Sequence, residues 1–315
     1  MNNTKIINIS LANPRGFCAG VDRAIQIVQM ALRKYGAPIY VRHEVVHNKH
    51  VIEELKKEGA IFVEEINQIP QGSHVIFSAH GVSKLIRKQA RDFNLIPIDA
   101  TCPLVTKVHR EVNQMYDDNY HIIMIGHQGH PEVEGTMGQI DKNSPNASIH
   151  LVQNLADVKQ LNIDSEKKIS YVSQTTLSID DTEKIIDALK KKFPKIRGPK
   201  TSDICYATQN RQDMIKKMVL NHDLIIIVGS SNSSNSNRLV DIAKENNVDS
   251  FLIDNMSFFD PSCLANKKKI GISAGASAPE ILVQQLIKKI KENSDVKVNE
   301  LDGIEENVSF KLPQF

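Results

Sequence analysis

The 315-residue sequence has no tryptophan, and aromatic residues make up only 5% of it. Its 39 lysines and arginines nearly balance 37 aspartates and glutamates, which leaves a formal net charge of +2. Nucleic-acid binding needs a basic surface, and single-strand binding also needs stacking aromatic rings, so neither is expected. The longest apolar runs, such as 224–228, are too short to cross a bilayer, and the N-terminus lacks an apolar signal core. We therefore expect a cytoplasmic protein without nucleic-acid or membrane partners.

Cysteine is also scarce. The four cysteines include no Cys-x-x-Cys pair and none of the short local spacings of zinc fingers and ferredoxins. Disulfides are rare in cytosolic chains of this size. Any metal site made from these residues must therefore be assembled by the fold.

Three of the cysteines share one local context. Cys18, Cys102 and Cys205 each lie just before an amphipathic helical pattern, and the first two follow an apolar run. A helix N-terminus favours the thiolate form, so this context predicts one shared metal site. The alternative, that they are small buried hydrophobic residues, stays open. Cys263 lies in a loop-like segment and is expected to be structural or incidental.

Apolar runs and helical patterns alternate along the chain, which is typical of an α/β fold with mainly parallel sheets. Ten predicted strands are too many for one typical sheet, so we expect three small α/β lobes, each introduced by one cysteine. The predicted strands are 5–11, 38–45, 73–78, 95–99, 121–125, 148–152, 168–173, 223–229, 249–253 and 269–273, and the predicted helices are 21–34, 48–58, 82–93, 103–118, 180–193, 206–220, 236–246 and 278–292. The predicted lobes are 20–101, 102–200, and 1–19 with 201–292, and 293–315 is a C-terminal tail.

Five loops that follow predicted strands have similar compositions. They read SAHGVS, GHQGHPEVEG, SQTTLS, GSSNSSNSN and SAGASAP, and they contain almost no lysine or arginine. Because ligands bind at the carboxyl ends of parallel strands, such loops predict a site where neutral donors hold an anionic group such as phosphate. The same residues are also ordinary turn and cap residues, so a purely structural role stays open.

His130 and Glu132 are candidates for proton transfer. A carboxyl group in an enclosed pocket can have its pKa raised enough to act as an acid near neutral pH. Local sequence alone favours the other interpretation, a solvated helix start where glutamate is common.

His43–His47 reads HEVVH and matches a zinc-protease pattern, which requires a helix. Here it continues the run APIYVR and contains two valines, so we expect extended chain, where the two histidines lie about 13 Å apart. A zinc hydrolase is therefore disfavoured. His47 and His80 each end a predicted strand, where both can donate to an anion.

Several of these motifs occur together in one known family. The strings ANPRGFCAGVDRAI, YVRHEVVHN, FSAHGVS, DATCPLVTKVH, GHPEVEGTMGQ, SQTTLS, DICYATQNRQ, VGSSNSSNSNRL and SAGASAP resemble the 4-hydroxy-3-methylbut-2-enyl diphosphate reductases, or LytB family. The resemblance extends from about Lys5 to Val308. It implies three lobes in a pseudo-threefold arrangement around a central iron–sulfur cluster.

The resemblance also implies roles for individual residues. Cys18, Cys102 and Cys205 would hold a [4Fe–4S] cluster and leave one iron open as a Lewis acid. Glu132 would deliver a proton, while Gln174 and Thr175 would lie near the substrate hydroxyl. The matching diphosphate binders are His47, His80, His130, Ser233, Ser234, Asn235 and Ser277.

The implied reaction is reductive dehydroxylation of (E)-4-hydroxy-3-methylbut-2-enyl diphosphate to isopentenyl and dimethylallyl diphosphate. A ferredoxin- or flavodoxin-type donor would supply two electrons through the cluster, and we expect a monomer. A non-catalytic protein that binds a phosphate ligand, with incidental cysteines, is the remaining alternative.

Overall fold

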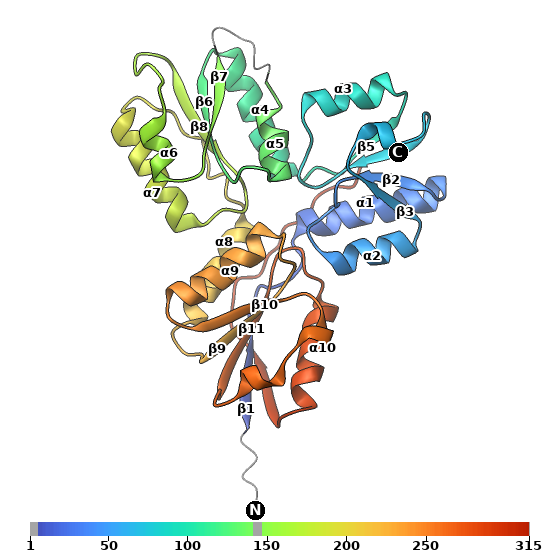
Figure 1. Cartoon of the computed structure of the whole chain (residues 1–315), viewed down its shortest axis with the longest axis vertical. Coiled ribbons are helices and arrows are strands. Elements are labelled where there is room, and N and C mark those ends of the chain that lie inside the picture. The colour runs from blue at the N-terminus through green and yellow to red at the C-terminus, as the bar shows by residue number, and fades with distance from the viewer. Residues whose placement is uncertain (1–5, 141–146, 315) are drawn as a thin grey trace, which may run out of the picture. The chain divides into compact units, whose positions relative to one another are not determined.

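The computed structural model describes residues 6–140 and 147–314. Residues 1–5, 141–146 and 315, which belong to the predicted lobes and tail, lie outside the described residues. The chain forms parallel β-sheets of five, four and three strands with helices between them, so the predicted α/β fold class is confirmed (Figure 1). It divides into two compact units. The first contains Met1–Asp22, His47–Glu54 and Tyr206–Ser309, and the second contains Arg23–Val46, Leu55–Cys205 and Phe310–Phe315.

The first unit contains the five-stranded sheet, in the order β10-β9-β11-β1-β12. Alternate residues of β9 pack on opposite faces: Leu224 and Ile226 lie in the cluster that contains α10, and Ile225 lies in the cluster that contains α8 and α9. Because helices cover both faces, this strand is apolar at every position. The strands are β1 (Ile7–Leu11), β9 (Leu224–Val228), β10 (Asp249–Ile253), β11 (Lys269–Ala274) and β12 (Val296–Glu300), and the helices are α8 (Tyr206–Met218), α9 (Ser234–Glu245) and α10 (Glu280–Lys291).

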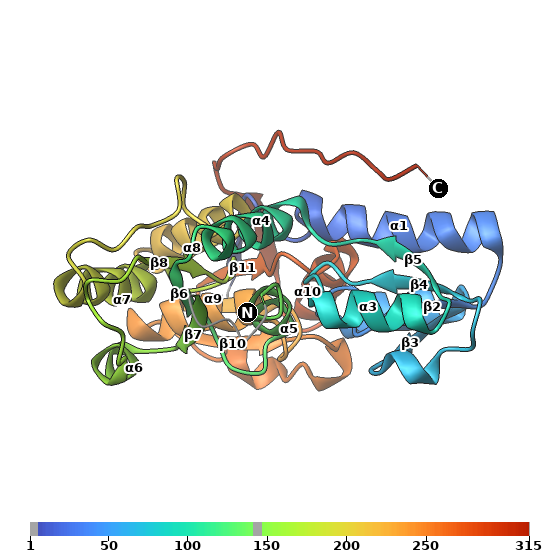
Figure 2. The same ribbon diagram turned by 90° about the horizontal axis from the view of Figure 1, so that it is seen from above.

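The second unit contains the other two sheets, in the orders β3-β2-β4-β5 and β7-β6-β8. Helix α3 packs on one face of the four-stranded sheet and α1 lies on the other (Figure 1). The three-stranded sheet lies between α4 with α5 and α6 with α7, as Figures 1 and 2 show. The strands are β2 (Ile39–Arg42), β3 (Ala60–Val63), β4 (His74–Phe77), β5 (Ile96–Asp99), β6 (His121–Ile125), β7 (Ser148–Val152) and β8 (Ile169–Ser173). The helices are α1 (Ala19–Tyr35), which begins in the first unit, α3 (Lys84–Asp92), α4 (Pro103–Asp117), α5 (Pro131–Met137), α6 (Leu155–Gln160) and α7 (Ile179–Lys192), and α2 (Lys49–Lys57) is divided between the units.

All ten predicted strands and all eight predicted helices are present, but the described residues also form two strands and two α-helices outside those ranges: β3, β12, α5 and α6. Strand β12 lies in the segment expected to be a tail and pairs in parallel with β1, Ile7 opposite Val296. It alternates apolar with polar residues and lies at the sheet edge, which weakens its sequence signal. The predicted lobe boundaries stay a prediction.

The HEVVH segment is neither helix nor strand. Strand β2 ends at Arg42, and His43 has a left-handed backbone (φ 58°), so the strand predicted over 38–45 is too long. A non-glycine residue in this region turns the chain out of the extended direction. The motif therefore also lacks the helix that zinc chelation by this pattern requires.

Across the described ranges, none of the helices combines the length and apolar character needed to span a bilayer.

Candidate functional site

The three cysteines at helix starts have the same backbone environment. Cys18 precedes α1, Cys102 is the N-cap of α4, and Cys205 precedes α8. The backbone N–H of each cysteine donates to the carbonyl of a residue in a loop that follows a strand. Each cysteine is therefore held both at a helix N-terminus and against a strand-end loop. The bonds are Cys18 to Ala276 (3.1 Å), Cys102 to Ala79 (2.9 Å) and Cys205 to Thr175 (3.1 Å).

The donor set fits an iron–sulfur cluster. None of the four cysteines forms a disulfide, and all are partly buried. Thiolates are the ligands of such clusters, and helix N-termini stabilise the thiolate form. Within residues 6–140 and 147–314, no three His, Cys, Asp or Glu side chains surround a point suited to one metal ion. A four-iron cluster takes one thiolate per iron, so its ligands do not need to meet at a single ion.

In the first unit, the side-chain oxygen of Asn235 has a hydrogen-bond partner but its amide nitrogen does not. Its side-chain oxygen accepts from the backbone N–H of Ala276 at 2.9 Å, which connects the first turn of α9 to the loop after β11. The residue is only 3% exposed, and its amide nitrogen is buried without a hydrogen-bond partner. A buried unpaired donor costs free energy, so the amide N–H₂ is suited to a ligand oxygen.

The loops around Asn235 are joined by hydroxyl groups. Ser233 caps α9 by accepting from the N–H of Ser236, and Ser234 begins the helix. The hydroxyl of Ser277 donates to the carbonyl of His47 at 2.8 Å. The structure thus brings His47, Asn235 and Ser277 into connected loops of the first unit. A helix N-terminus with hydroxyl and amide groups favours an anion.

In the second unit, Glu132 is buried, with 3% of its surface exposed. One carboxyl oxygen accepts from the N–H of Thr175 at 2.6 Å, and the other accepts from the Thr175 hydroxyl at 2.9 Å. Burial raises the pKa of Glu132 to about 7, although the Thr175 hydrogen bonds oppose this increase. Glu132 does lie at a helix start, in the first turn of α5, but the solvated environment that local sequence favours is wrong because the side chain is buried. Near neutral pH this carboxyl holds a proton that it can release.

Two histidines lie near this acid. His130 is the N-cap of α5, and its Nδ1 accepts from the N–H of Glu132 at 3.1 Å. In the neutral ring the proton is therefore on Nε2, which can donate to a ligand. The rings of His80 and His130 meet edge to face with centroids 5.8 Å apart. The structure thus brings together His80, His130 and Glu132.

Thr175 connects the acid to a cysteine. Its N–H and hydroxyl bind Glu132, and its carbonyl accepts from Cys205. Gln174 is fully buried; its side chain accepts from His127 N–H at 3.1 Å and donates to the Thr176 hydroxyl at 3.0 Å. Gln174 therefore positions the strand-end loops on both sides of the acid.

Sequence reasoning missed Arg211, which is fully buried in α8. Its guanidinium binds the carbonyl of Gly16, two residues before Cys18, and pairs with Glu306. The signal was a single arginine on a helix face otherwise occupied by Ala207, Met214 and similar buried residues. A charged residue on such a face is rarely buried unless it is paired.

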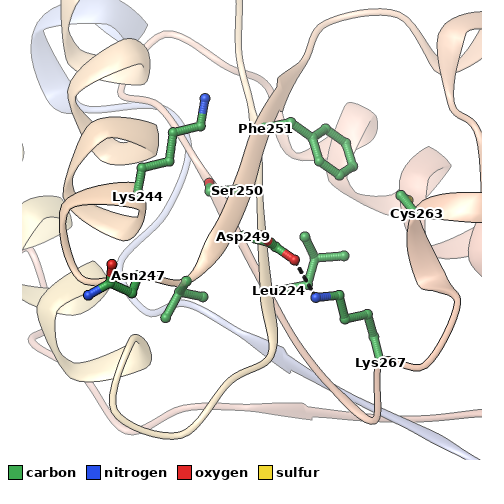
Figure 3. A pocket seen from close by; sticks show the side chains of 9 residues that line it. Leu224, Lys244, Asn247, Asp249, Ser250, Phe251, Cys263 and Lys267 are labelled. Atoms are coloured by element: carbon green, nitrogen blue, oxygen red, sulfur yellow. Dashed lines mark hydrogen bonds and ion pairs between the residues drawn. The ribbon is translucent and has the colours of Figure 1, made fainter.

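Cys263 does not share the helix-start context of the other three cysteines. It occupies a short 3₁₀ turn, Pro261–Leu264, and packs against the core of the first unit. Figure 3 shows it beside a cavity of about 540 Å³ near the ion pair of Lys267 and Asp249. This cavity lies at the amino ends of β9 and β10, whereas the loop with Ser233 follows the carboxyl end of β9. The two edges are separated by the length of a five-residue strand, about 16 Å.

The fold and site define an α/β protein in which cysteines at helix starts, a buried acid and strand-end hydroxyl groups occur together. The family model described as LytB protein matches residues 9–291. A 4-hydroxy-3-methylbut-2-enyl diphosphate reductase of Nitrosomonas europaea is 56% identical over 315 residues, covering 98% of this chain and 97% of the relative. The same enzyme of Azoarcus is 54% identical over 314 residues, covering 100% and 98%.

Solved structures agree with these relatives. The E-1-hydroxy-2-methyl-but-2-enyl-4-diphosphate reductase of Plasmodium falciparum superimposes with a TM-score of 0.93 at 44% identity, covering 98% of this chain and 96% of that one. A second structure, described as the terminal enzyme of the non-mevalonate pathway, gives 0.64 at 30% identity, covering 91% and 100%. The chain belongs to the LytB family, that of the 4-hydroxy-3-methylbut-2-enyl diphosphate reductases.

Proposed function

We propose that this chain removes the hydroxyl group of (E)-4-hydroxy-3-methylbut-2-enyl diphosphate by reduction and forms isopentenyl and dimethylallyl diphosphate. It is an iron–sulfur oxidoreductase of the LytB family, whose members use a [4Fe–4S] cluster. The observation that carries the proposal is the chain of contacts from buried Glu132 through Thr175 to Cys205. It connects a protonated carboxyl with a cluster ligand of the proposed set.

Cys18, Cys102 and Cys205 are the proposed cluster ligands, which leaves one iron without a protein ligand. When bound, the cluster supplies electrons and a Lewis-acidic iron at the substrate oxygen. Hydrogen bonds near the three helix starts support this assignment. One joins α1 to α8, a second joins α1 to the segment before α4, and a third joins α4 to the segment before α8, each within one unit. The bonds are Ala19 N–H to the Tyr206 hydroxyl (3.3 Å), Arg23 to the Thr101 carbonyl (3.1 Å) and Lys107 to the Asp203 carboxylate (3.0 Å).

Neutral donors are the proposed binders of the diphosphate. The unpartnered amide of Asn235 donates to a phosphate oxygen, and the first turn of α9 adds its dipole. The further proposed binders are His47, His80, His130, Ser233, Ser234 and Ser277. The hydroxyl group at the other end of the substrate is assigned to Thr175 and Glu132, whose contacts lie within the second unit.

Glu132 is the proposed proton donor to the departing oxygen, which leaves as water. Burial keeps this carboxyl protonated in part at neutral pH, and Thr175 orients both of its oxygens. A donor with a pKa near the working pH is the most effective general acid. The adjacent Gln174 holds the loop in which Thr175 lies.

The test is turnover of the diphosphate substrate with a chemical reductant, measured for the wild type and for Glu132→Gln. We expect kcat to fall by about 10²-fold or more, the range of general acid catalysis, while iron content and diphosphate affinity are retained. Glu134→Gln, at an exposed position of the same helix, is the matched control and should keep its activity. Undiminished turnover in Glu132→Gln would remove Glu132 from the mechanism.

A ferredoxin- or flavodoxin-type electron donor, a monomeric state and a cytoplasmic location stay predictions from the sequence. A non-catalytic protein that binds a phosphate ligand remains the second hypothesis. It explains Asn235, but it gives no role to a buried acid that is hydrogen-bonded to a loop touching Cys205.

A further inference from the structure

The loop that contains Cys18 is hydrogen-bonded to a buried guanidinium. Arg211 is 0% exposed, and its Nε and Nη2 donate to the carbonyl of Gly16 at 3.2 and 2.7 Å. Gly16 itself has a left-handed backbone (φ 67°). Two charge-assisted hydrogen bonds to one carbonyl fix both the position and the orientation of the Gly16 peptide.

The charge of Arg211 is balanced by the C-terminal segment. Glu306 accepts from Nη1 at 3.0 Å and from Nη2 at 3.3 Å, and it also accepts from Asn210 at 2.9 Å. Removing one partner of a buried ion pair leaves an uncompensated charge, which is strongly unfavourable. Arg211 Nη1 also donates to the carbonyl of Ala207 at 2.9 Å, but Glu306 supplies the negative charge that this buried guanidinium pairs with.

The same C-terminal segment also contacts the Cys18 loop directly. Leu301 N–H donates to the carbonyl of Leu11 at 2.9 Å, immediately before the loop. Gly303 approaches Asn13 so closely that an added Cβ would lie 1.6 Å from the Asn13 carbonyl oxygen. Residues 301–306, which we call the C-terminal strap, therefore contact the start of the loop and complete the ion pair beneath it.

We propose that Arg211, Glu306 and the C-terminal strap are positioning elements for Cys18 as a ligand of the iron–sulfur cluster. The inference rests on the proposed function, because it takes Cys18 to be a ligand. The hydrogen bonds of Arg211 go to Gly16, Ala207 and Glu306. Arg211 fixes the peptide two residues before Cys18, while the N–H of Cys18 is fixed separately by Ala276. Without the contacts of Arg211 and the C-terminal strap, the loop would open locally more often, and the side chain of Cys18 would then be more accessible to solvent.

Two substitutions test the strap in different ways. Glu306→Gln removes the countercharge of Arg211, and Gly303→Ala pushes the strap off Asn13 without changing any charge. Glu245→Gln is the matched control, because Glu245 makes a similar two-oxygen pair with Arg238 in α9 of the same unit. The carboxylate of Glu245 pairs with Arg238, whereas that of Glu306 pairs with Arg211.

The measurement is the alkylation rate of each cysteine in full-length protein purified without oxygen, followed by peptide mass spectrometry. We expect labelling of Cys18 to rise about tenfold or more in Glu306→Gln and Gly303→Ala, with Cys102 and Cys205 within about twofold of wild type. The control should match the wild type at all three positions. The electron paramagnetic resonance spectrum of the reduced cluster should shift in the two strap variants only.

General loosening of the protein would raise labelling of all three cysteines alike, and that result would overturn the inference. Unchanged labelling of Cys18 in both strap variants would overturn it as well. If one variant does not fold, the other still decides, because they perturb different contacts. A wild type without iron would refute the proposed function, whereas the labelling ratio would still report whether the strap holds the Cys18 loop.

Discussion

Replacing Glu132 by glutamine is expected to change how protein stability depends on pH. Burial raises the pKa of this carboxyl from 4.5 to about 7 in the folded protein. Between these values the folded state binds more protons than the unfolded chain, so the free energy of unfolding falls as pH rises. Glutamine does not ionise and avoids this loss, while its side-chain oxygen still accepts from Thr175.

The size of the effect follows from the pKa difference at about 1.4 kcal/mol per unit. Relative to pH 4, the variant should gain about 2 kcal/mol over the wild type by pH 6 and about 3 kcal/mol by pH 8. Urea unfolding of the iron-free, reduced full-length protein, followed by circular dichroism at these pH values, measures the difference. Glu134→Gln, at an exposed position, should show no comparable trend. A difference between wild type and Glu132→Gln that stays constant from pH 4 to pH 8 would refute the assigned burial of the charge.

Three further predictions concern turnover and substrate affinity. With the wild type, kcat should fall as pH rises above about 7, because Glu132 then loses its proton; a rate that is flat up to pH 9 would contradict this. Thr175→Val removes a hydroxyl that lowers the pKa of Glu132, so the falling limb should move up by about one pH unit in the same pH–rate profile. Asn235→Asp keeps the acceptor for Ala276 but replaces the amide donor by a charge, so KM should rise about tenfold or more without loss of thermal stability; an unchanged KM in steady-state kinetics would remove Asn235 from the diphosphate site.

The core strands could be predicted because their sequence pattern and their burial coincide. Strand β9 is apolar at all five positions, since helices cover both faces of its sheet. Strand β12 could not, because it is a half-exposed edge strand whose apolar positions alternate with polar ones. Helix α5 has only seven residues and contains Gly135, so its helical signal is weak.

Some features of the candidate site could also be predicted from the sequence, and others could not. The helix-start positions of Cys18, Cys102 and Cys205 followed from local patterns, because strand, turn and helix each leave a signal in sequence. The burial of Glu132 did not, since it depends on Thr175, more than forty residues away in the chain. The burial and pairing of Arg211 could not be predicted for the same reason, because its partners Gly16 and Glu306 lie 195 and 95 residues away in the chain.

The central claim is that three cysteines from separate parts of the chain hold one cluster. Iron and acid-labile sulfide, measured per chain in protein purified without oxygen, test it most directly when each cysteine is changed in turn to serine. We expect about four iron atoms in the wild type and in Cys263→Ser, and a large loss of iron in Cys18→Ser, Cys102→Ser and Cys205→Ser. Full iron content in any of these three variants, or loss of iron in Cys263→Ser, would contradict the ligand assignment.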